Sequence, residues 1–185
     1  MTCKMIKDTL LCLLATVFMC GTIAVSAEPD PVQKTASVTP DAFQRTREQA
    51  VAEAALLQDA MHTILQVVHH RYYKEDEGLV IPAATMREVF EELERDHHVK
   101  LRWLVVEGQA MNSEHIARDE FEKAAVQALL AGEKKFESFE NGVYRRAGPV
   151  TLSNVCLKCH IPDRRSTEDR TAGLIVTIPL RENAK

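Results

Sequence analysis

The sequence predicts one α+β domain with a mostly antiparallel sheet and a long N-terminal helix. Three observations support this fold class. Apolar residues recur at helical spacing over a long stretch before residue 73, short alternating segments occur in the second half, and an Asn-Gly pair separates two of them. A chain of 185 residues with 45% hydrophobic residues is long enough to bury a core of this kind.

The first predicted element is a long helix from residue 41 to about Tyr73. Thr39 offers a capping hydroxyl, Pro40 suits the first helical position and Asp41 places an acid in the first turn. The preceding residues, 28–40, contain proline and threonine without apolar periodicity, so we expect a flexible lead-in there. A turn then leads to a second helix over residues 83–96.

The pattern changes to strand after the second helix. One more helix is predicted over residues 117–131, where Gly132 ends it. The pair Asn141-Gly142 lies between two alternating segments and is typical of a β-hairpin. A glycine-led apolar run near the C-terminus predicts a final buried strand. The predicted strands are residues 99–106, 135–140, 143–146 and 173–180.

The charges of the chain argue against one broad class of function. There are 23 Lys and Arg residues against 27 Asp and Glu residues, which gives a net charge of −4 with both signs dispersed. A nucleic-acid-binding protein normally presents a basic face. We therefore expect no nucleic acid among the partners.

Residues 1–27 have the pattern of a secretory signal peptide. Two lysines precede an apolar run over residues 10–25, and small residues at 25–27 suit a signal peptidase. The alternative is a retained membrane anchor, because the run is barely long enough to cross a hydrocarbon core of about 30 Å. We therefore expect an exported, periplasmic protein that contacts a membrane only if this segment is retained.

Export changes the cysteine count. Cys3, Cys12 and Cys20 lie within the predicted signal peptide, so only Cys156 and Cys159 remain in the exported chain. These two cysteines belong to one motif, Cys-Leu-Lys-Cys-His, which is the attachment signature of haem c. The two thiols form thioethers with two vinyl groups of one porphyrin, and the imidazole of His160 then binds the iron.

Three other uses of a Cys-x-x-Cys pair fit less well. A zinc site needs four ligands, and the chain offers no second pair at suitable spacing. A thioredoxin-type pair lies early, between a strand and a helix. A disulfide across two residues is strained. We therefore predict a single, covalently bound haem c.

The position of the motif argues against two common cytochrome types. Small helical electron carriers have an axial Met well after the motif, and no Met follows His160 here. Four-helix-bundle cytochromes do have a C-terminal motif. They would not have a hairpin before it and an apolar strand after it.

Five short motifs occur along the chain in a recognisable order. They are Met111-Asn112, Phe121-Glu122, Tyr144-Arg145-Arg146-Ala147, Cys156-to-His160 and Gly173-to-Leu180. This order, over about residues 45–181, resembles a family of single-haem c-type proteins long catalogued as a domain of unknown function. The resemblance implies a PAS-like domain over residues 41–181, with one covalent haem and a role in redox or ligand sensing or in electron transfer.

In that family the second axial ligand can be a cysteine on the N-terminal helical part. No such cysteine remains here after export. The sixth iron position is therefore taken by another side chain or stays open.

Histidines on the first helix are candidates for this position. At about 100° per residue, the apolar residues from Leu56 to Tyr72 cover a face about 180° wide, with His69 and His70 on its opposite edges. A side chain at an edge can turn toward a half-buried cofactor. We expect His69 or His70 to bind the iron or line the distal pocket, with a slight preference for His70. The alternative is a solvated helix end, and weaker candidates are His62, His97, His98, His115 and Met111.

Three arginines are candidates for binding the haem propionates, because a guanidinium group matches a carboxylate in bidentate fashion. They are Arg102, Arg145 and Arg146, and Tyr144 and Trp103 are candidates for packing on the porphyrin. The alternatives are ordinary charges on the strand surface and ordinary core packing.

These observations predict an exported mono-haem c-type cytochrome that senses redox state or a small gas ligand. The alternative is a periplasmic electron-transfer cytochrome that docks to a redox partner protein. The sensor requires an open or displaceable sixth site, whereas the carrier requires two axial ligands in both redox states. Nothing beyond the haem favours an enzyme.

Overall fold

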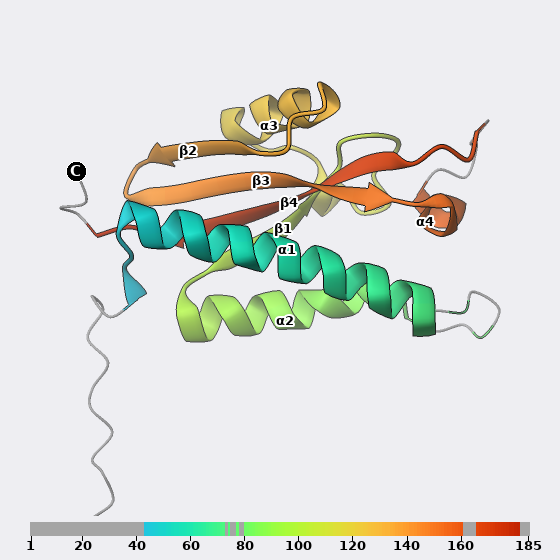
Figure 1. Cartoon of the computed structure of the whole chain (residues 1–185), viewed down its shortest axis with the longest axis horizontal. Helices are drawn as coiled ribbons and strands as arrows, with labels where there is room; N and C mark the ends of the chain where they lie inside the picture. The colour runs from blue at the N-terminus through green and yellow to red at the C-terminus, as the bar shows by residue number, and fades with distance from the viewer. Residues whose placement is uncertain (1–42, 73, 75–76, 78–79, 161–165, 182–185) are drawn as a thin grey trace, which may run out of the picture. The chain divides into compact units, whose positions relative to one another are not determined.

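Within residues 43–72, 74, 77, 80–160 and 166–181, which the computed structural model describes, helices pack on both faces of one antiparallel sheet (Figure 1). The helices are α1 (Arg47–Tyr72), α2 (Pro82–His97), the 3-10 helix η3 (Ser113–His115), α3 (Glu120–Leu130) and α4 (Asn154–His160). The strands are β1 (Lys100–Leu104), β2 (Phe136–Glu140), β3 (Val143–Leu152) and β4 (Arg170–Pro179). The predicted α+β class, antiparallel sheet and long N-terminal helix are confirmed. The predicted signal peptide and lead-in lie outside the described residues.

The start of α1 differs from the prediction. The helix begins at Arg47 rather than at residue 41 because Thr46 and Gln49 form a capping box. The Thr46 hydroxyl accepts a bond from Gln49 N at 3.3 Å, and Gln49 Oε1 accepts one from Thr46 N at 2.9 Å. Arg45, just before the cap, forms a parallel bridge with Leu180 and so cannot be helical. Residues 41 and 42 lie outside the described residues.

The sheet has the strand order β1-β4-β3-β2 with antiparallel neighbours throughout. The predicted hairpin is confirmed: Asn141 and Gly142 join β2 to β3 with φ values of 53° and 72°, as a type I′ turn requires. β3 is longer than predicted and continues to Leu152. Because β2 covers β3 only as far as Ala147, Pro149 lies where one side of β3 has no strand partner, and a missing N–H is tolerated there.

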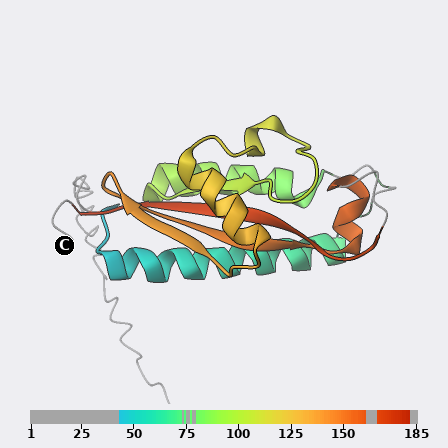
Figure 2. The ribbon, with the colours of Figure 1, turned by 90° about the horizontal axis from the view of Figure 1, so that it is seen from above.

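The two faces of the sheet are covered by different helices. α1 and α2 lie side by side on one face, and α3 crosses the other (Figure 2). Alternate residues of β4 follow this division, since Leu174, Val176 and Ile178 pack toward α1 and α2, while Ile175 packs toward α3. None of the helices in the described part of the chain is long and apolar enough to span a membrane.

Candidate functional site

The Cys-x-x-Cys-His motif lies on α4, at one end of the sheet (Figure 1). The helix follows β3 almost directly, and the carbonyl of Ser153 accepts bonds from Cys156 N at 2.8 Å and from Leu157 N at 3.1 Å. Leu157 is fully buried and anchors the helix on the domain, whereas Cys156 is half-buried. Two positions three apart in a helix share one face, as attachment of one porphyrin requires. The side chains of Cys159 and His160 lie outside what the structure describes.

The C-terminal half of α1 is tied to the end of β3. His62 Nε2 accepts a hydrogen bond from Thr151 N at 3.4 Å, and Gln66 Nε2 donates one to Thr151 O at 2.7 Å. Thr151 is close in sequence to Ser153, which directly precedes α4. These two bonds therefore fix the end of α1 relative to the helix that carries the motif.

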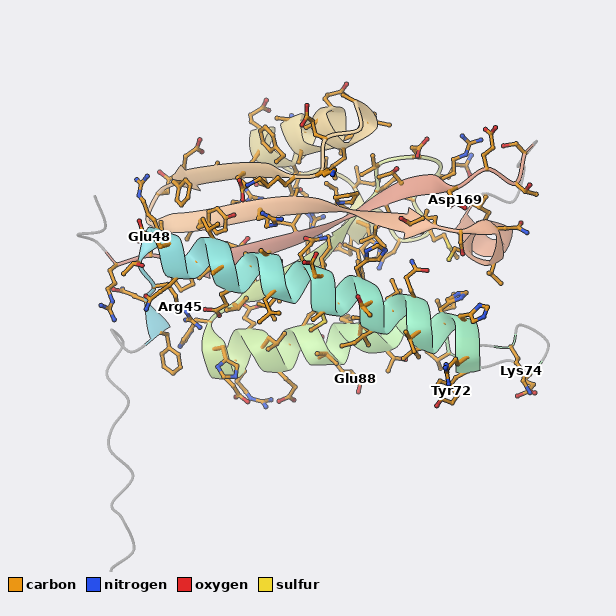
Figure 3. All side chains as sticks on the ribbon, viewed as in Figure 1. Arg45, Glu48, Tyr72, Lys74, Glu88 and Asp169 are labelled. Atoms are coloured by element: carbon orange, nitrogen blue, oxygen red, sulfur yellow. The ribbon has the colours of Figure 1, made fainter. Side chains whose placement is uncertain are left out.

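A cavity of about 320 Å³ lies between the last turns of α1 and the start of α4. Its walls are formed by Gln66, Val67, His69, His70, Arg71, Ser153 and Val155. In Figure 3, Tyr72 marks the C-terminal end of α1, and Asp169 precedes β4 at the same end of the sheet. Both histidines predicted from the helical pattern are thus beside the motif helix.

The two histidines differ in burial. His69 is half-buried and His70 is exposed. Burial lowers the pKa of His69 from its ordinary value of 6.5, so its imidazole is mostly neutral at pH 7, which is the form that binds metals.

The other predicted site residues lie away from α4. Along β3, Arg145 is seven residues from Leu152, which corresponds to roughly 23 Å of strand. Arg145 and Arg102 both bind the carboxylate of Glu122, at 3.2 Å and 2.6 Å, on the face that α3 covers. The structure does not bring these arginines beside the motif.

Arg146 and Tyr144 share one acidic partner. Arg146 Nη1 lies 2.8 Å from Glu137 Oε1, and the fully buried Tyr144 donates its hydroxyl to the same oxygen. Burial and the Glu137 carboxylate raise the pKa of Tyr144 to about 12. Both residues join β2 to β3 at the hairpin end of the sheet.

The remaining candidates also have positions apart from α4. Trp103 donates its indole N–H to Ala83 O at 3.1 Å and packs on Phe90, with 5.1 Å between the ring centroids. His98 caps the C-terminal end of α2 and contacts Phe43 near the start of α1. His97 is the last residue of α2, His115 lies in η3, and Met111 is exposed on a loop.

The carboxylates of Asp119 and Glu137, which bind Arg145 and Arg146, should make the stability of the fold depend on pH in acid. Burial raises the pKa of Asp119, but bonds from Glu122 N and from Arg145 outweigh it and leave the pKa below 3.8. Burial likewise raises the pKa of Glu137, and bonds from Lys135, Tyr144 and Arg146 bring it below 4.5. In acid the unfolded chain therefore binds more protons at these two groups than the folded chain does. Their contribution to the free energy of unfolding is complete above the ordinary pKa values and is lost as the pH falls through the lower pKa values of the folded protein.

We expect the free energy of unfolding in urea to be nearly constant from about pH 7 to 5.5 and to decline below about pH 5. Asp119→Asn and Glu137→Gln should each be less stable than the wild type near neutrality and show a shallower decline. Glu88→Gln is the control, because Glu88 is exposed on α2 (Figure 3). Parallel pH profiles for all four proteins would contradict the assignment.

Sequence reasoning missed two residues that the structure places at the site. Gln66 binds Thr151, and Ser153 precedes α4, accepts bonds from its first turn and lines the cavity. Gln66 lies four residues after His62 and four before His70, so a polar stripe along α1 was present in the sequence. Ser153 gave no signal, because its role depends on where β3 ends.

The comparisons with known proteins give one family and one solved structure. A family model described as Tll0287-like matches residues 43–178. The crystal structure of the cyanobacterial haem protein Tll0287 is similar, with 18% sequence identity and a TM-score of 0.49; the match covers 76% of this chain and 100% of that chain. No curated protein matches this chain.

Proposed function

Because the chain belongs to the Tll0287-like family, we propose that it is an exported, non-enzymatic haem c module. Cys156 and Cys159 would hold one haem covalently, and His160 would bind its iron. Tll0287, whose name the family bears, is described as a haem protein, which accords with the motif. The predicted signal peptide supports a periplasmic location, where covalent attachment of haem takes place.

The single observation that most favours this function is the placement of the motif. β3 leads directly into α4, and the histidine-bearing end of α1 lies across a cavity from the start of that helix. The start of the helix that carries the motif thus lies beside a cavity whose other wall includes the imidazoles of His69 and His70.

The described residues around this space fit a porphyrin. Val67 and Val155 both line the cavity and are 47% and 46% exposed, so an apolar ring between them would cover surface that now faces water. Cys156 is half-buried rather than enclosed by the domain. The cavity is smaller than a whole haem, so one edge of the porphyrin would project into solvent.

The chain's own residues then have separate tasks. Leu157 holds α4 on the domain, while His62 and Gln66 hold the end of β3 against α1. His69 and His70 line the wall of the cavity that α1 forms, across from Ser153 and Val155. When bound, the haem supplies a one-electron redox centre and an iron with axial positions.

Two roles use this arrangement. The first is sensing of redox state or of a small gas, in which the sixth position of the iron can be vacated. The second is electron transfer to a redox partner protein. The two imidazoles on the cavity wall are an observation in favour of electron transfer, because either could supply a second nitrogen ligand to a bound haem.

The test is to produce the full chain in a host that attaches haem c and to measure the mass and haem content of the denatured protein. We expect one haem per chain that survives denaturation, and none after Cys156→Ser with Cys159→Ser. Cys20→Ser is the matched control, because Cys20 lies in the predicted signal peptide. A wild-type protein without covalent haem would overturn the proposal. Binding of CO to the reduced protein separates an open or displaceable sixth site from a permanently occupied one.

A further inference from the structure

We propose that the free edge of β1 is a docking site for an extended segment of a partner protein, which adds to the sheet as a short further strand. The site lies in a cavity of about 500 Å³ between α2, β1 and residues 111–118. Figure 2 shows residues 111–118 in yellow beside α2. The inference does not depend on a haem, because α1 and α4 do not line this cavity.

The register of the sheet decides which backbone groups of β1 face outward. In the two-residue hairpin, Glu140 and Val143 flank the turn and bond each other. Because bonded pairs alternate along antiparallel strands, even-numbered residues of β3 bond β4 and odd-numbered residues of β4 bond β1. Arg102 therefore bonds β4, whereas Leu101 and Trp103 turn their N–H and C=O groups away from it.

Bonds at the two ends of β1 agree with this direction. Val105, two residues after Trp103, donates its N–H to His115 O at 2.9 Å, and Val99 N bonds the last turns of α2 at 3.4 Å. Between these two bonds, within the described part of the chain, no hydrogen bond reaches the backbone groups of Leu101 and Trp103. Unpaired groups at a sheet edge are a template for another strand. They offer two N–H and two C=O groups over roughly 7 Å.

The cavity lies along these unpaired groups. Leu101, Arg102 and Trp103 line it from β1, and α2 forms one wall with residues that include Ala84 and Phe90. Leu101 and Trp103 pack on the α2 side of the sheet, where the centroids of the Trp103 and Phe90 rings are 5.1 Å apart. Alternate side chains of a strand share one face, so an added strand presents every second side chain to this apolar wall. The segment should therefore have apolar side chains at alternate positions.

The charges of the cavity do not exclude such a segment. Three glutamates line it, and each has a basic partner. The pairs are Glu91 with Arg87 at 3.6 Å, Glu94 with Lys100 at 2.9 Å, and Glu114 with Arg118. The occupant is recognised by its backbone and its apolar side chains rather than by charge.

The walls of the cavity also favour a segment of another protein over a second copy of this chain. The edge of β1 lies between α2 and residues 111–118. In a second copy the same two walls flank β1, and they would collide with those of the first copy before the two edges met. An extended segment without such walls can enter the cavity.

The experiment uses a library of blocked heptapeptides in which threonine alternates with valine, leucine, isoleucine or phenylalanine. Binding to the isotope-labelled full chain is measured by NMR. We expect members of the library to bind and to slow hydrogen exchange of the Leu101 and Trp103 amides about tenfold or more, with little change at Arg102. Methylation of one alternate set of peptide nitrogens should weaken binding about tenfold or more, because it removes the bonds to β1. Methylation of the other set should have little effect.

A variant on the wall tests the location of the site. Ala84→Trp should weaken binding, because Ala84 is exposed on α2 and lines the cavity. Ala52→Trp is the matched control, because Ala52 is exposed on α1. If Ala84→Trp does not fold, Met111→Trp on the opposite wall gives the same test.

Four results would overturn the inference. They are a library without a binding member, equal losses from methylation of either set of nitrogens, a bound peptide that leaves exchange at Leu101 and Trp103 unchanged, or equal binding to Ala84→Trp and Ala52→Trp. A dimer of the free protein that Ala84→Trp dissociates would assign the edge to a second copy and would also overturn it. Failure of the proposed function is distinct, because it is measured by the haem content of the same protein.

Discussion

Replacing Glu122 by alanine is expected to lower the free energy of unfolding by about 3–5 kcal/mol, the range found when one partner of a buried ion pair is removed. The Glu122 side chain is only 4% exposed, and it binds Arg102 at 2.6 Å and Arg145 at 3.2 Å. It also accepts a bond from Arg118 N at 2.7 Å. The substitution leaves two guanidinium groups, 22% and 20% exposed, without that charge.

Urea denaturation at pH 7 measures this loss. Glu120→Ala is the matched control, because Glu120 lies on the same helix but its side chain is 90% exposed and pairs with Lys123 at the surface. We expect that control to change stability by less than about 1 kcal/mol. A loss below about 1 kcal/mol for Glu122→Ala as well would show that the arginines find other partners.

Replacing Gly148 by alanine is expected to cost about 1–3 kcal/mol, the usual range for overpacking a core. A Cβ atom at this position would lie 2.5 Å from Cδ and 2.7 Å from Nε2 of Gln58. Gln58 is 4% exposed on the buried side of α1, so its amide has little room to move. Among the described residues, neither amide atom of Gln58 has a hydrogen-bond partner.

A double-mutant cycle isolates this contact. In a Gln58→Ala background the space opposite Gly148 is open, so Gly148→Ala should cost little there. Four urea titrations, of the wild type, the two single variants and the double variant, give the coupling energy. Equal costs of Gly148→Ala in the two backgrounds would exclude a clash with Gln58 as the cause.

Local patterns in the sequence predicted much of the fold. α2 begins and ends within one residue of its predicted limits, and the Asn141-Gly142 turn lies between the two strands as expected. The resemblance to a haem-binding family formerly of unknown function is confirmed by the family match over residues 43–178. These features depend on short-range periodicity, on turn chemistry and on motif order, all of which the sequence contains directly.

The errors lie at the ends of elements, where a cap or a contact with a later segment sets the boundary. β1 ends at Leu104 rather than at residue 106, and Val105 N bonds His115 O in η3. α3 begins at Glu120 rather than at residue 117, because Asp119 caps it by accepting a bond from Glu122 N. In the first case the partner lies ten residues away in sequence, and periodicity cannot supply it.

The candidate site divides in the same way. The Cys-x-x-Cys-His motif and the place of the histidines on α1 can be predicted from spacing alone, because both are local patterns of the sequence. Spacing does not predict which carboxylates bind the three arginines. Glu122 on α3 binds Arg102 and Arg145, and Glu137 on β2 binds Arg146. The sequence alone does not distinguish an arginine that binds a carboxylate of the protein from one that binds a haem propionate.

The bonds from α1 to Thr151 also bear on association between molecules. Beyond Ala147, β3 has a strand neighbour on one side only, and such an edge is a template for pairing with a strand of another chain. His62 and Gln66 bind the N–H and the C=O of Thr151, next to the last residue of β3, and so block that template near its end. The same two side chains that fix α1 relative to the motif helix should thus also disfavour pairing of this edge with a strand of another molecule.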